Sequence, residues 1–218
     1  KNINEIDSFK KGDWWVQDYS SFIPLQNFEI KVRDKKFLDA CAAPGGKSFQ
    51  ILSKNHELLL NDKSKTRIKI LKSNLKRLNL NAKVSNQDFI KFKEKEKYDF
   101  ILIDAPCSAV GTIRKNPEIF FKSKGPNFKS LTNLQNIMLE KAANLLNTNG
   151  FIIYMVCSFL KSENEDQIGN FLNKFNNFEI FDFNHTSQNI KYSKLINNNF
   201  MKTLPDTFLG YNIDGYFA

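Results

Sequence analysis

Two cysteines, Cys107 and Cys157, each follow a run of apolar residues that is typical of a buried strand. The first run, Phe100–Ile103, ends in Asp104-Ala105-Pro106-Cys107, and the second, Phe151–Val156, ends directly at Cys157. Ligands of open α/β sheets bind at the carboxyl ends of the strands, so an acid and two thiols at these ends indicate nucleophilic chemistry. Either cysteine could instead be a small buried hydrophobic residue, and the rest of the chain has to decide.

A loop rich in small residues, Cys41–Lys47 (CAAPGGK), follows a short predicted strand, Lys36–Ala40. Its glycines allow backbone amides to approach a ligand closely, at the start of a helix that we expect from about Lys47. Asp62 follows the next predicted strand, at about the spacing at which a carboxylate reaches a nucleotide ribose. Asp88 follows the strand after that. The sequence thus places a nucleotide-type loop and two further acids at strand ends.

The elements that must position these groups alternate between strands and helices. The predicted strands are Lys36–Ala40, Leu58–Asn61, Ala82–Ser85, Tyr98–Ile103, Phe151–Val156, Phe178–Phe183 and a closing strand, Tyr211–Ala218. The predicted helices begin at about Lys47, span Lys65–Leu78 and Leu131–Leu146, and follow a capping box of Ser162 and Glu165. We expect residues 112–130 to form an extended basic loop and residues 185–206 to be irregular. The alternation predicts an α/β protein with a parallel, doubly wound sheet, whose strand ends converge on one edge.

The first 35 residues are predicted to form an N-terminal lid or linker that packs on a catalytic domain of residues 36–218. Within this segment, Gly12–Ser21 (GDWWVQDYSS) carries both tryptophans and two acids, which is more than a linker needs. We expect it to cover the end of the sheet and to form one wall of a binding cleft.

The composition, with 41% hydrophobic and 25% charged residues in a chain of 218, is that of a soluble globular protein with a substantial core. No apolar run is long enough to span a bilayer, and the start does not resemble a signal peptide. Three widely spaced cysteines predict neither a disulfide framework nor a zinc site, so we expect no metal and a reducing cytoplasm. The net charge of +9 favours a polyanionic partner, although lysine and asparagine are abundant throughout the chain.

Two cofactor classes are compatible with the loop. Gly46-Lys47-Ser48 matches the end of a phosphate-binding loop of nucleotide triphosphatases, and Asp104 could hold magnesium. That pattern requires glycine where this chain has Cys41, and Pro44 removes an amide donor. A methyltransferase that uses S-adenosylmethionine fits better, because its cofactor needs amides for a carboxylate, an acid for the ribose and a polar group for adenine.

The thiols indicate which atom would accept the methyl group. Carbon 5 of cytosine is a poor nucleophile, and a thiolate that adds to carbon 6 activates it. Methyl transfer is followed by loss of the carbon 5 proton and expulsion of the thiolate. An acid that donates a hydrogen bond to the ring favours the addition.

Three motifs resemble those of the RsmB/Nop2/Sun family of RNA cytosine-5 methyltransferases, and its bacterial ribosomal RNA enzymes are the most similar. They are CAAPGGK (41–47), DAPCSAVGTIRKNPE (104–118), and VCS (156–158) with SENE (162–165) downstream. The resemblance extends from VQD (16–18) to DGYF (214–217). It implies a Rossmann-like class I methyltransferase fold, with a mostly parallel sheet and an antiparallel last strand.

The resemblance also implies the roles of the site residues. Cys157 would be the nucleophile and Cys107 would help to release the product, while Asp104 would contact both the cofactor and the base. The residues implied to bind S-adenosylmethionine are Cys41, Ala42, Ala43, Pro44, Gly45, Gly46, Lys47, Asp62, Asp88 and Asp104.

The chain departs from the family in two ways. Val156 stands where a threonine is usual, and the N-terminal helical RNA-binding domain of bacterial relatives is not part of the sequence. We therefore expect the basic loop 112–124 and the tryptophan segment to contribute more to RNA binding, with Arg114 and Lys115 as phosphate contacts.

The function predicted from the sequence is methylation of carbon 5 of a cytosine in RNA, and we expect small-subunit (16S) ribosomal RNA to be the substrate. The target base must be exposed or flipped out for the thiolate to reach it. We expect a cytoplasmic monomer without a membrane contact. The alternatives are formation of 5-methylcytosine in tRNA and a catalytically silent RNA-binding module on the same fold.

Overall fold

The structure is a computed structural model that describes residues 2–27, 35–54, 56–93, 96–121, 125–181 and 190–218. Its described residues form two compact units. The first comprises those of Lys1–Gln17, Val32–Asp104 and Leu145–Ile152, and the second those of Asp18–Lys31, Ala105–Asn144 and Ile153–Ala218. The predicted N-terminal segment of residues 1–35 is thus divided between the two units. Its action as a lid stays a prediction.

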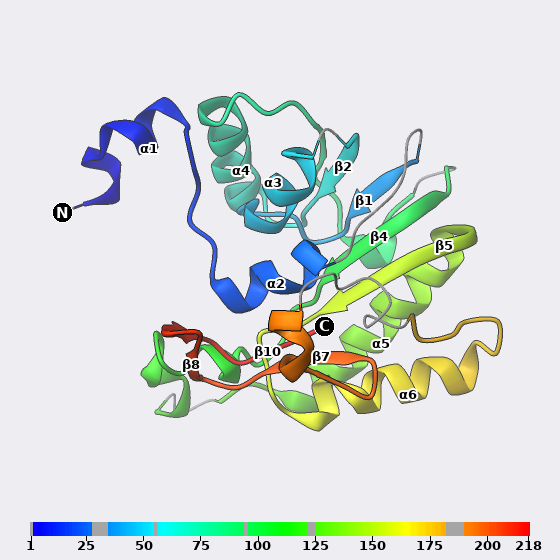
Figure 1. The fold of residues 1–218 in the computed structure, drawn as a ribbon. Coiled ribbons are helices and arrows are strands. Elements are labelled where there is room, and N and C mark those ends of the chain that lie inside the picture. Colours follow the sequence, from blue (N-terminus) through cyan, green and yellow to red (C-terminus); the bar gives the residue numbers. More distant parts are fainter. Residues whose placement is uncertain (1, 28–34, 55, 94–95, 122–124, 182–189) are drawn as a thin grey trace. The chain divides into compact units, whose positions relative to one another are not determined.

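The first unit is built on a parallel sheet with the strand order β3-β2-β1-β4-β5 (Figure 1). The strands are β1 (Phe37–Asp39), β2 (Leu58–Asn61), β3 (Lys83–Ser85), β4 (Tyr98–Asp104) and β5 (Leu146–Met155), the last of which continues into the second unit. Leu38 of β1 lies in parallel register with Leu59 on one side and Ile101 on the other. Leu38 and Ile101 are fully buried, as expected for strands that are covered on both faces.

Two helices of the first unit, α3 (Gly46–Leu52) and α4 (Lys65–Arg77), lie side by side next to β2 in Figure 1. The Ser64 hydroxyl caps α4 by accepting the N–H of Arg67. Ile68, Leu71 and Leu75 form the buried face of α4, as the three- and four-residue spacing predicts. The unit also contains η1 (Ile3–Glu5), α1 (Asp7–Lys11) and η2 (Phe89–Lys91).

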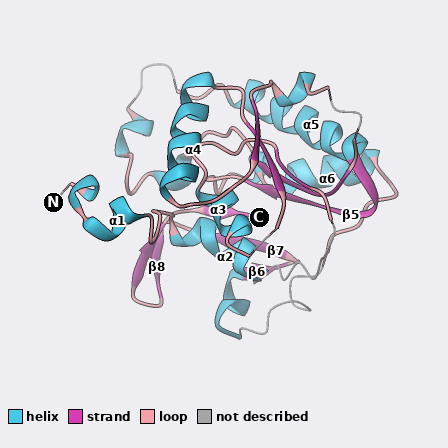
Figure 2. Ribbon diagram, turned by 90° about the horizontal axis from the view of Figure 1, so that it is seen from above, coloured by secondary structure: helices cyan, strands magenta, loops and turns pink. Residues whose placement is uncertain are grey.

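The second unit contains the two helices α5 (Phe128–Leu145) and α6 (Glu165–Lys174), which lie side by side in Figures 1 and 2. An ion pair of 2.6 Å joins Lys174 of α6 to Glu140 of α5. The other elements are α2 (Tyr19–Asn27), η3 (Val110–Thr112), η4 (Pro117–Phe120), η5 (Lys161–Glu163), η7 (Ile190–Leu195), β6 (Ile196–Asn197), β7 (Phe200–Thr203), β8 (Asp206–Phe208), β9 (Tyr211–Ile213) and β10 (Tyr216–Phe217).

The predicted antiparallel last strand is confirmed. β10 pairs antiparallel with β7, and Phe217 forms an antiparallel bridge with Val156, directly after β5. The predicted closing strand Tyr211–Ala218 is nevertheless wrong as a single strand, because β9 and β10 are separate and pair with different partners.

Three further predictions about the second unit are wrong. Ser162 does not cap α6, because it lies inside the 3-10 turn η5 and the N-cap is Asn164, without a side-chain hydrogen bond. No strand covers Phe178–Phe181, where the Phe178 ring packs instead on Phe171 of α6 and on Phe175, the C-cap of that helix. The rest of that predicted strand lies outside the described residues. The segment 190–203, expected to be irregular, forms η7, β6 and β7.

No helix among the described residues is both long and apolar enough to cross a bilayer.

Candidate active site

The loop Cys41–Lys47 connects β1 to α3 in the first unit, as predicted. Gly45 has φ +120°, and a Cβ at this position would lie 2.0 Å from the ring of Phe49. Glycine is therefore required at position 45 both by the backbone conformation and by the lack of space. Pro44 follows a cis peptide bond. The loop leads directly into α3, which begins at Gly46.

Asp39, at the end of β1, supports this loop from beneath. Its Oδ1 accepts the N–H of Cys41 at 3.2 Å, and its Oδ2 accepts the Ser48 hydroxyl at 2.6 Å. Burial raises the pKa of the Asp39 carboxyl to about 7. Sequence reasoning missed this role. The available signal was an acid two residues before the first residue of the loop, followed nine residues later by a serine.

Lys47 and Asp104 join the loop to the end of β4. Lys47 Nζ lies 2.8 Å from Asp104 Oδ2, and both side chains are only partly exposed. The first unit therefore brings together two of the predicted cofactor-binding positions that are far apart in the sequence. The lysine also places a positive charge at the carboxyl edge of the sheet.

Asp62 is buried against the same loop. Its carboxylate accepts the N–H of Ala43 at 3.2 Å and that of Ser64 at 2.8 Å, and Arg67 lies 3.4 Å away. Two carboxylate oxygens offer about four acceptor positions, so the group retains capacity for a ligand hydroxyl.

Asp88 is exposed after β3, where it accepts the N–H of Ile90. Asn61, which the sequence did not single out, donates from its side-chain amide to the carbonyls of Ala40 and Gln87. It thereby ties the start of the loop to the residue that precedes Asp88.

The tryptophan segment lies beside this loop. The Trp15 ring packs edge-to-face on Phe49, at 6.0 Å between centroids, and its indole N–H donates to Gln17. Gln17 in turn donates to Gln50 of α3 at 3.0 Å. A Cβ added to Gly46 would lie 3.8 Å from Gln17 Cγ and from the Val16 carbonyl oxygen, so there is space for a small group between the loop and this segment. The first unit thus brings together the loop, the Asp62 carboxylate and the Trp15 ring, a set that fits a nucleoside with an amino-acid tail.

In the second unit, the Sγ atoms of Cys107 and Cys157 lie 3.4 Å apart, and both residues are partly exposed. The two chain segments run side by side because the N–H of Ala105 donates to the carbonyl of Met155. The Cys157 sulfur and burial both raise the pKa of the Cys107 thiol. Cys107 is therefore suited to remain protonated and to donate its S–H to Cys157.

Gly111 holds the backbone of Cys157 in place. Its N–H donates to the Cys157 carbonyl at 3.0 Å, and its carbonyl accepts the N–H of Gly215 at 2.8 Å. A Cβ on Gly111 would lie 2.0 Å from the Gly215 oxygen and 2.9 Å from the Cys157 oxygen. Only glycine allows this approach, which ties the loop after Cys107 to the second thiol.

Glu163 fixes the residue next to Cys107. Its buried carboxylate accepts both the N–H of Ser108 (2.8 Å) and the Ser108 hydroxyl (2.5 Å), and Gln135 donates to it at 3.1 Å. Gln135 also donates to the Pro106 carbonyl. The motif SENE (162–165) includes this acid, but the sequence predicted only a helix cap, formed by Ser162 and Glu165, and no role for Glu163.

Cys41 differs chemically from the other two cysteines. Burial, together with the carboxylates of Asp39, Asp104 and Asp62, raises the pKa of its thiol. A thiol in this setting stays protonated and is a poor nucleophile, so the contribution of this residue is through its main chain.

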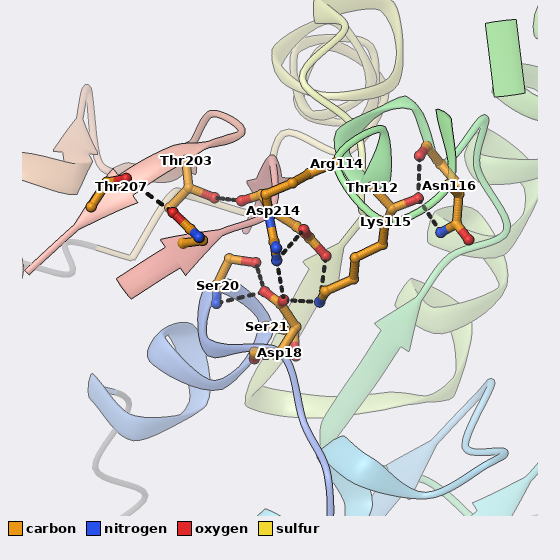
Figure 3. A network of polar contacts seen from close by, with 12 residues as sticks. Asp18, Ser20, Ser21, Thr112, Arg114, Lys115, Asn116, Thr203, Thr207 and Asp214 are labelled. Carbon is orange, nitrogen blue, oxygen red and sulfur yellow. Dashed lines mark hydrogen bonds and ion pairs between the residues drawn. The ribbon is translucent and has the colours of Figure 1, made fainter. Parts of the chain in front are cut away.

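The expected phosphate contacts Arg114 and Lys115 are engaged by acids. Arg114 lies 3.1 Å from Asp214, and Lys115 lies 2.8 Å from the same carboxylate and also pairs with Asp18. Figure 3 shows these four side chains pointing toward one another. Their role as phosphate contacts stays a prediction, and without RNA both cations are paired with carboxylates. Lys122 and Lys124 of the same basic loop lie outside the described residues.

Comparison with known proteins places the chain in a family. Residues 29–218 match the family described as 16S rRNA methyltransferase RsmB/F. The chain belongs to this family, within the wider RsmB/Nop2/Sun group. The family and the Rossmann-like class I S-adenosylmethionine-dependent methyltransferase fold predicted from the motifs are thereby confirmed.

Among the curated relatives is ribosomal RNA small subunit methyltransferase B of Photorhabdus laumondii, 36% identical over 177 residues. The match covers 79% of this chain and 41% of the relative. The Vibrio vulnificus protein of the same name is 34% identical over 176 residues, which cover 78% of this chain and 41% of the relative. The chain thus spans about two fifths of the length of the curated relatives that it matches.

Two solved structures resemble the chain over its whole length. NSun6 from Pyrococcus horikoshii, crystallised with SFG, has a TM-score of 0.84 and 26% identity, covering 100% of this chain and 55% of that protein. A methyltransferase homologue from the same organism has a TM-score of 0.77 and 26% identity, covering 100% of this chain and 70% of that protein.

Proposed function

We propose that this chain transfers a methyl group from S-adenosylmethionine to carbon 5 of a cytosine in RNA, through a covalent bond between Cys157 and carbon 6. The observation that carries the proposal is the pair of thiols, Cys107 and Cys157, at 3.4 Å. Membership in the RsmB/F family and the similarity to small-subunit ribosomal RNA methyltransferases support ribosomal RNA as the substrate.

The first unit supplies the residues for the cofactor in this proposal. The main chain of Cys41–Lys47 would bind the amino-acid tail, Asp62 the ribose hydroxyls and Asp88 the adenine. S-adenosylmethionine supplies an electrophilic methyl group when bound. Asp39 binds the N–H of Cys41 and so supports the loop, and Asp104, paired with Lys47, would contact the cofactor and the base.

The second unit supplies the covalent chemistry. Cys157, as a thiolate, attacks carbon 6 of the flipped cytosine, which makes carbon 5 nucleophilic. The S–H of Cys107 can donate a hydrogen bond to the Cys157 sulfur, which favours its thiolate. After methyl transfer, carbon 5 gives its proton to water, and the electron pair of that bond forms the double bond between carbons 5 and 6. Cys157 leaves carbon 6 as a thiolate, and Cys107 assists this release.

Replacement of each cysteine separates the two roles. Cys157→Ala should abolish methyl transfer to unmodified small-subunit ribosomal RNA, whereas Cys107→Ala should accumulate a protein–RNA adduct that survives denaturing electrophoresis. Both variants are compared with the wild type in the presence and absence of S-adenosylmethionine. An adduct with Cys157→Ala, and none with Cys107→Ala, would reverse the assignment.

Two alternatives are tested by the same assay. If tRNA but not ribosomal RNA acquires 5-methylcytosine, the reaction stands and the substrate is corrected. If neither RNA is methylated while both are bound, the chain is an RNA-binding module. We further propose a cytoplasmic monomer, for which size-exclusion chromatography with light scattering tests the oligomeric state.

A further inference from the structure

We propose that four lysines of α4 and the hollow at the end of that helix form a second RNA-binding surface, outside the proposed reaction site. The lysine row is Lys65, Lys69, Lys72 and Lys76. The inference rests on the proposed function in one respect, namely that RNA is the macromolecule bound. In this proposal the first unit binds RNA phosphates through the lysine row. It also binds, in the hollow, one nucleotide other than the target nucleotide.

The spacing of the lysine row places its members on one side of the helix. Positions three and four residues apart are neighbours on a helix surface, and the row follows the steps four, three and four. All four side chains are exposed, and α4 contains no acidic residue (KTRIKILKSNLKR). The helix therefore presents a continuous positive stripe, which is the electrostatic footprint of nucleic-acid binding.

The other cations of α4 already have partners within the unit. Arg67 pairs with Asp62, and Arg77 donates to the carbonyls of Phe9 and Trp14. In the part of the chain that the structure describes, none of the four row lysines pairs with an acid. Arg114 and Lys115, in contrast, have their charges neutralised by carboxylates, so the row lysines are better suited to bind phosphates.

A hollow of about 490 Å³ adjoins the row at the C-terminal end of α4. Its lining combines aliphatic side chains with cations and amides: Leu75, Leu80, Ala82, Val84, Lys72, Lys76, Asn79 and Asn81. Its volume is within the range of sites for small molecules. An aliphatic wall can pack against a nucleobase, amides can bind its edge and lysines its phosphates, so the lining suits one nucleotide.

The row also has a suitable direction and length. It begins at Lys65, shortly after Asp62 at the carboxyl edge of the sheet, and runs toward the opposite edge of β2 and β3. With a rise of about 1.5 Å per residue, it is about 16 Å long, enough for several phosphates of one strand. An RNA strand that leaves the cofactor edge along α4 would reach the hollow at its end.

The salt dependence of RNA binding tests the row. We compare the wild type with K65Q/K69Q/K72Q/K76Q, using a radiolabelled transcript of unmodified small-subunit ribosomal RNA in filter binding at several salt concentrations. The slope of log affinity against log salt should fall by about three, and affinity at about 0.1 M salt should fall at least about tenfold. Thermal melting checks that the variant is folded.

A charge-matched control separates the row from net charge. K10Q/K11Q/K161Q/K174Q removes the same charge from other exposed positions and should lower the slope by much less. Equal losses in the two quadruple variants, or an unchanged slope in the row variant, would overturn the proposal.

The hollow is tested by crosslinking. RNA containing 4-thiouridine should crosslink to peptides within residues 72–84. Asn79→Gly removes an amide while retaining the backbone conformation, since Asn79 has φ 53°, and should reduce that crosslink. Crosslinks confined to other segments would exclude the hollow as a nucleotide site.

Methyl-transfer kinetics distinguish this inference from the proposed function. The row variant should show a raised KM for RNA with kcat retained at saturating RNA, because none of the four lysines belongs to the reaction site. Row-dependent binding without any methylation would refute the proposed function and leave the surface intact. Methylation with an unchanged KM would refute the surface and leave the function intact.

Discussion

The buried carboxylate of Glu163 accepts two hydrogen bonds from Ser108, one from the backbone N–H at 2.8 Å and one from the hydroxyl at 2.5 Å. Ser108 directly follows Cys107, so Glu163 determines where the first thiol lies. This acid lies 55 residues from Ser108 in the sequence, and it is fully buried without a charged partner among the described ion pairs.

Glu163→Gln should therefore be costly. The new amide would place its N–H groups opposite Ser108 and Gln135, which donate hydrogen bonds to the carboxylate of Glu163. Such a mismatch of buried polar groups costs about 1–3 kcal/mol. Urea unfolding should show this loss, and methyl transfer should fall with it. Glu165→Gln, in the same motif but partly exposed and paired with Lys202, should change stability by less than about 1 kcal/mol. Similar effects of both substitutions would contradict the positioning role of Glu163.

Gly45→Ala should weaken cofactor binding. The added Cβ would lie 2.0 Å from the Phe49 ring at a φ of +120°, so the loop Cys41–Lys47 must change shape. Isothermal titration with S-adenosylmethionine should show at least about a tenfold loss of affinity, equivalent to about 1.4 kcal/mol. Gly169→Ala is the matched control, since no atom lies within 4 Å in the middle of α6. It should stabilise the protein by about 0.5–1 kcal/mol and leave affinity unchanged.

Asp39→Asn should alter the pH dependence of stability. The pKa of Asp39 is raised to about 7 in the folded chain, from an ordinary value of 3.8. Between these values the folded state holds more protons than the unfolded state, so the contribution of Asp39 to stability falls as pH rises. Urea unfolding from about pH 5 to about pH 8 should show a shallower decline for the variant than for the wild type. A difference between the two proteins that does not vary with pH would contradict the assignment.

Mild oxidation should join the two thiols. With Sγ atoms 3.4 Å apart, Cys107 and Cys157 can form a disulfide when diamide takes up their two hydrogens and is reduced to the hydrazine. Intact mass spectrometry should show a loss of two hydrogen atoms, with methyl transfer lost and then restored by dithiothreitol. Cys107→Ala should show no such mass change, and a disulfide that involves Cys41 would contradict the expectation.

Local periodicity correctly predicted β2 and α4 of the first unit, which contains the proposed cofactor-binding residues. β2 spans Leu58–Asn61 as expected, and α4 ends one residue before the predicted Leu78. Both rest on patterns that are complete within a few residues, such as the buried stripe of Ile68, Leu71 and Leu75. The motifs similarly indicated that Cys107 and Cys157 lie close together, although not that Gly111 and Glu163 position them.

The errors arose where a specific side-chain contact, and not local periodicity, decides the structure. The apolar run at Phe178 has the composition of a strand, yet its ring is satisfied by Phe171 and Phe175. The contact between Arg114 and Asp214 joins residues 100 positions apart, so no local pattern indicated it. Asp39 and Glu163 were missed for the same reason, since their hydrogen-bond partners cannot be recognised from sequence spacing alone.

Because the pKa of Asp39 is about 7, binding of a charged ligand at the loop Cys41–Lys47 can change the protonation of this carboxyl group. Near neutral pH, Asp39 is divided between its protonated and ionised forms, and the charge of Asp104 favours the protonated one. A positively charged sulfonium bound beside these acids would favour ionisation and release part of a proton, whereas the neutral product of the methyl transfer would not. The measured heat of cofactor binding should then depend on the ionisation enthalpy of the buffer, and the heat of product binding should not.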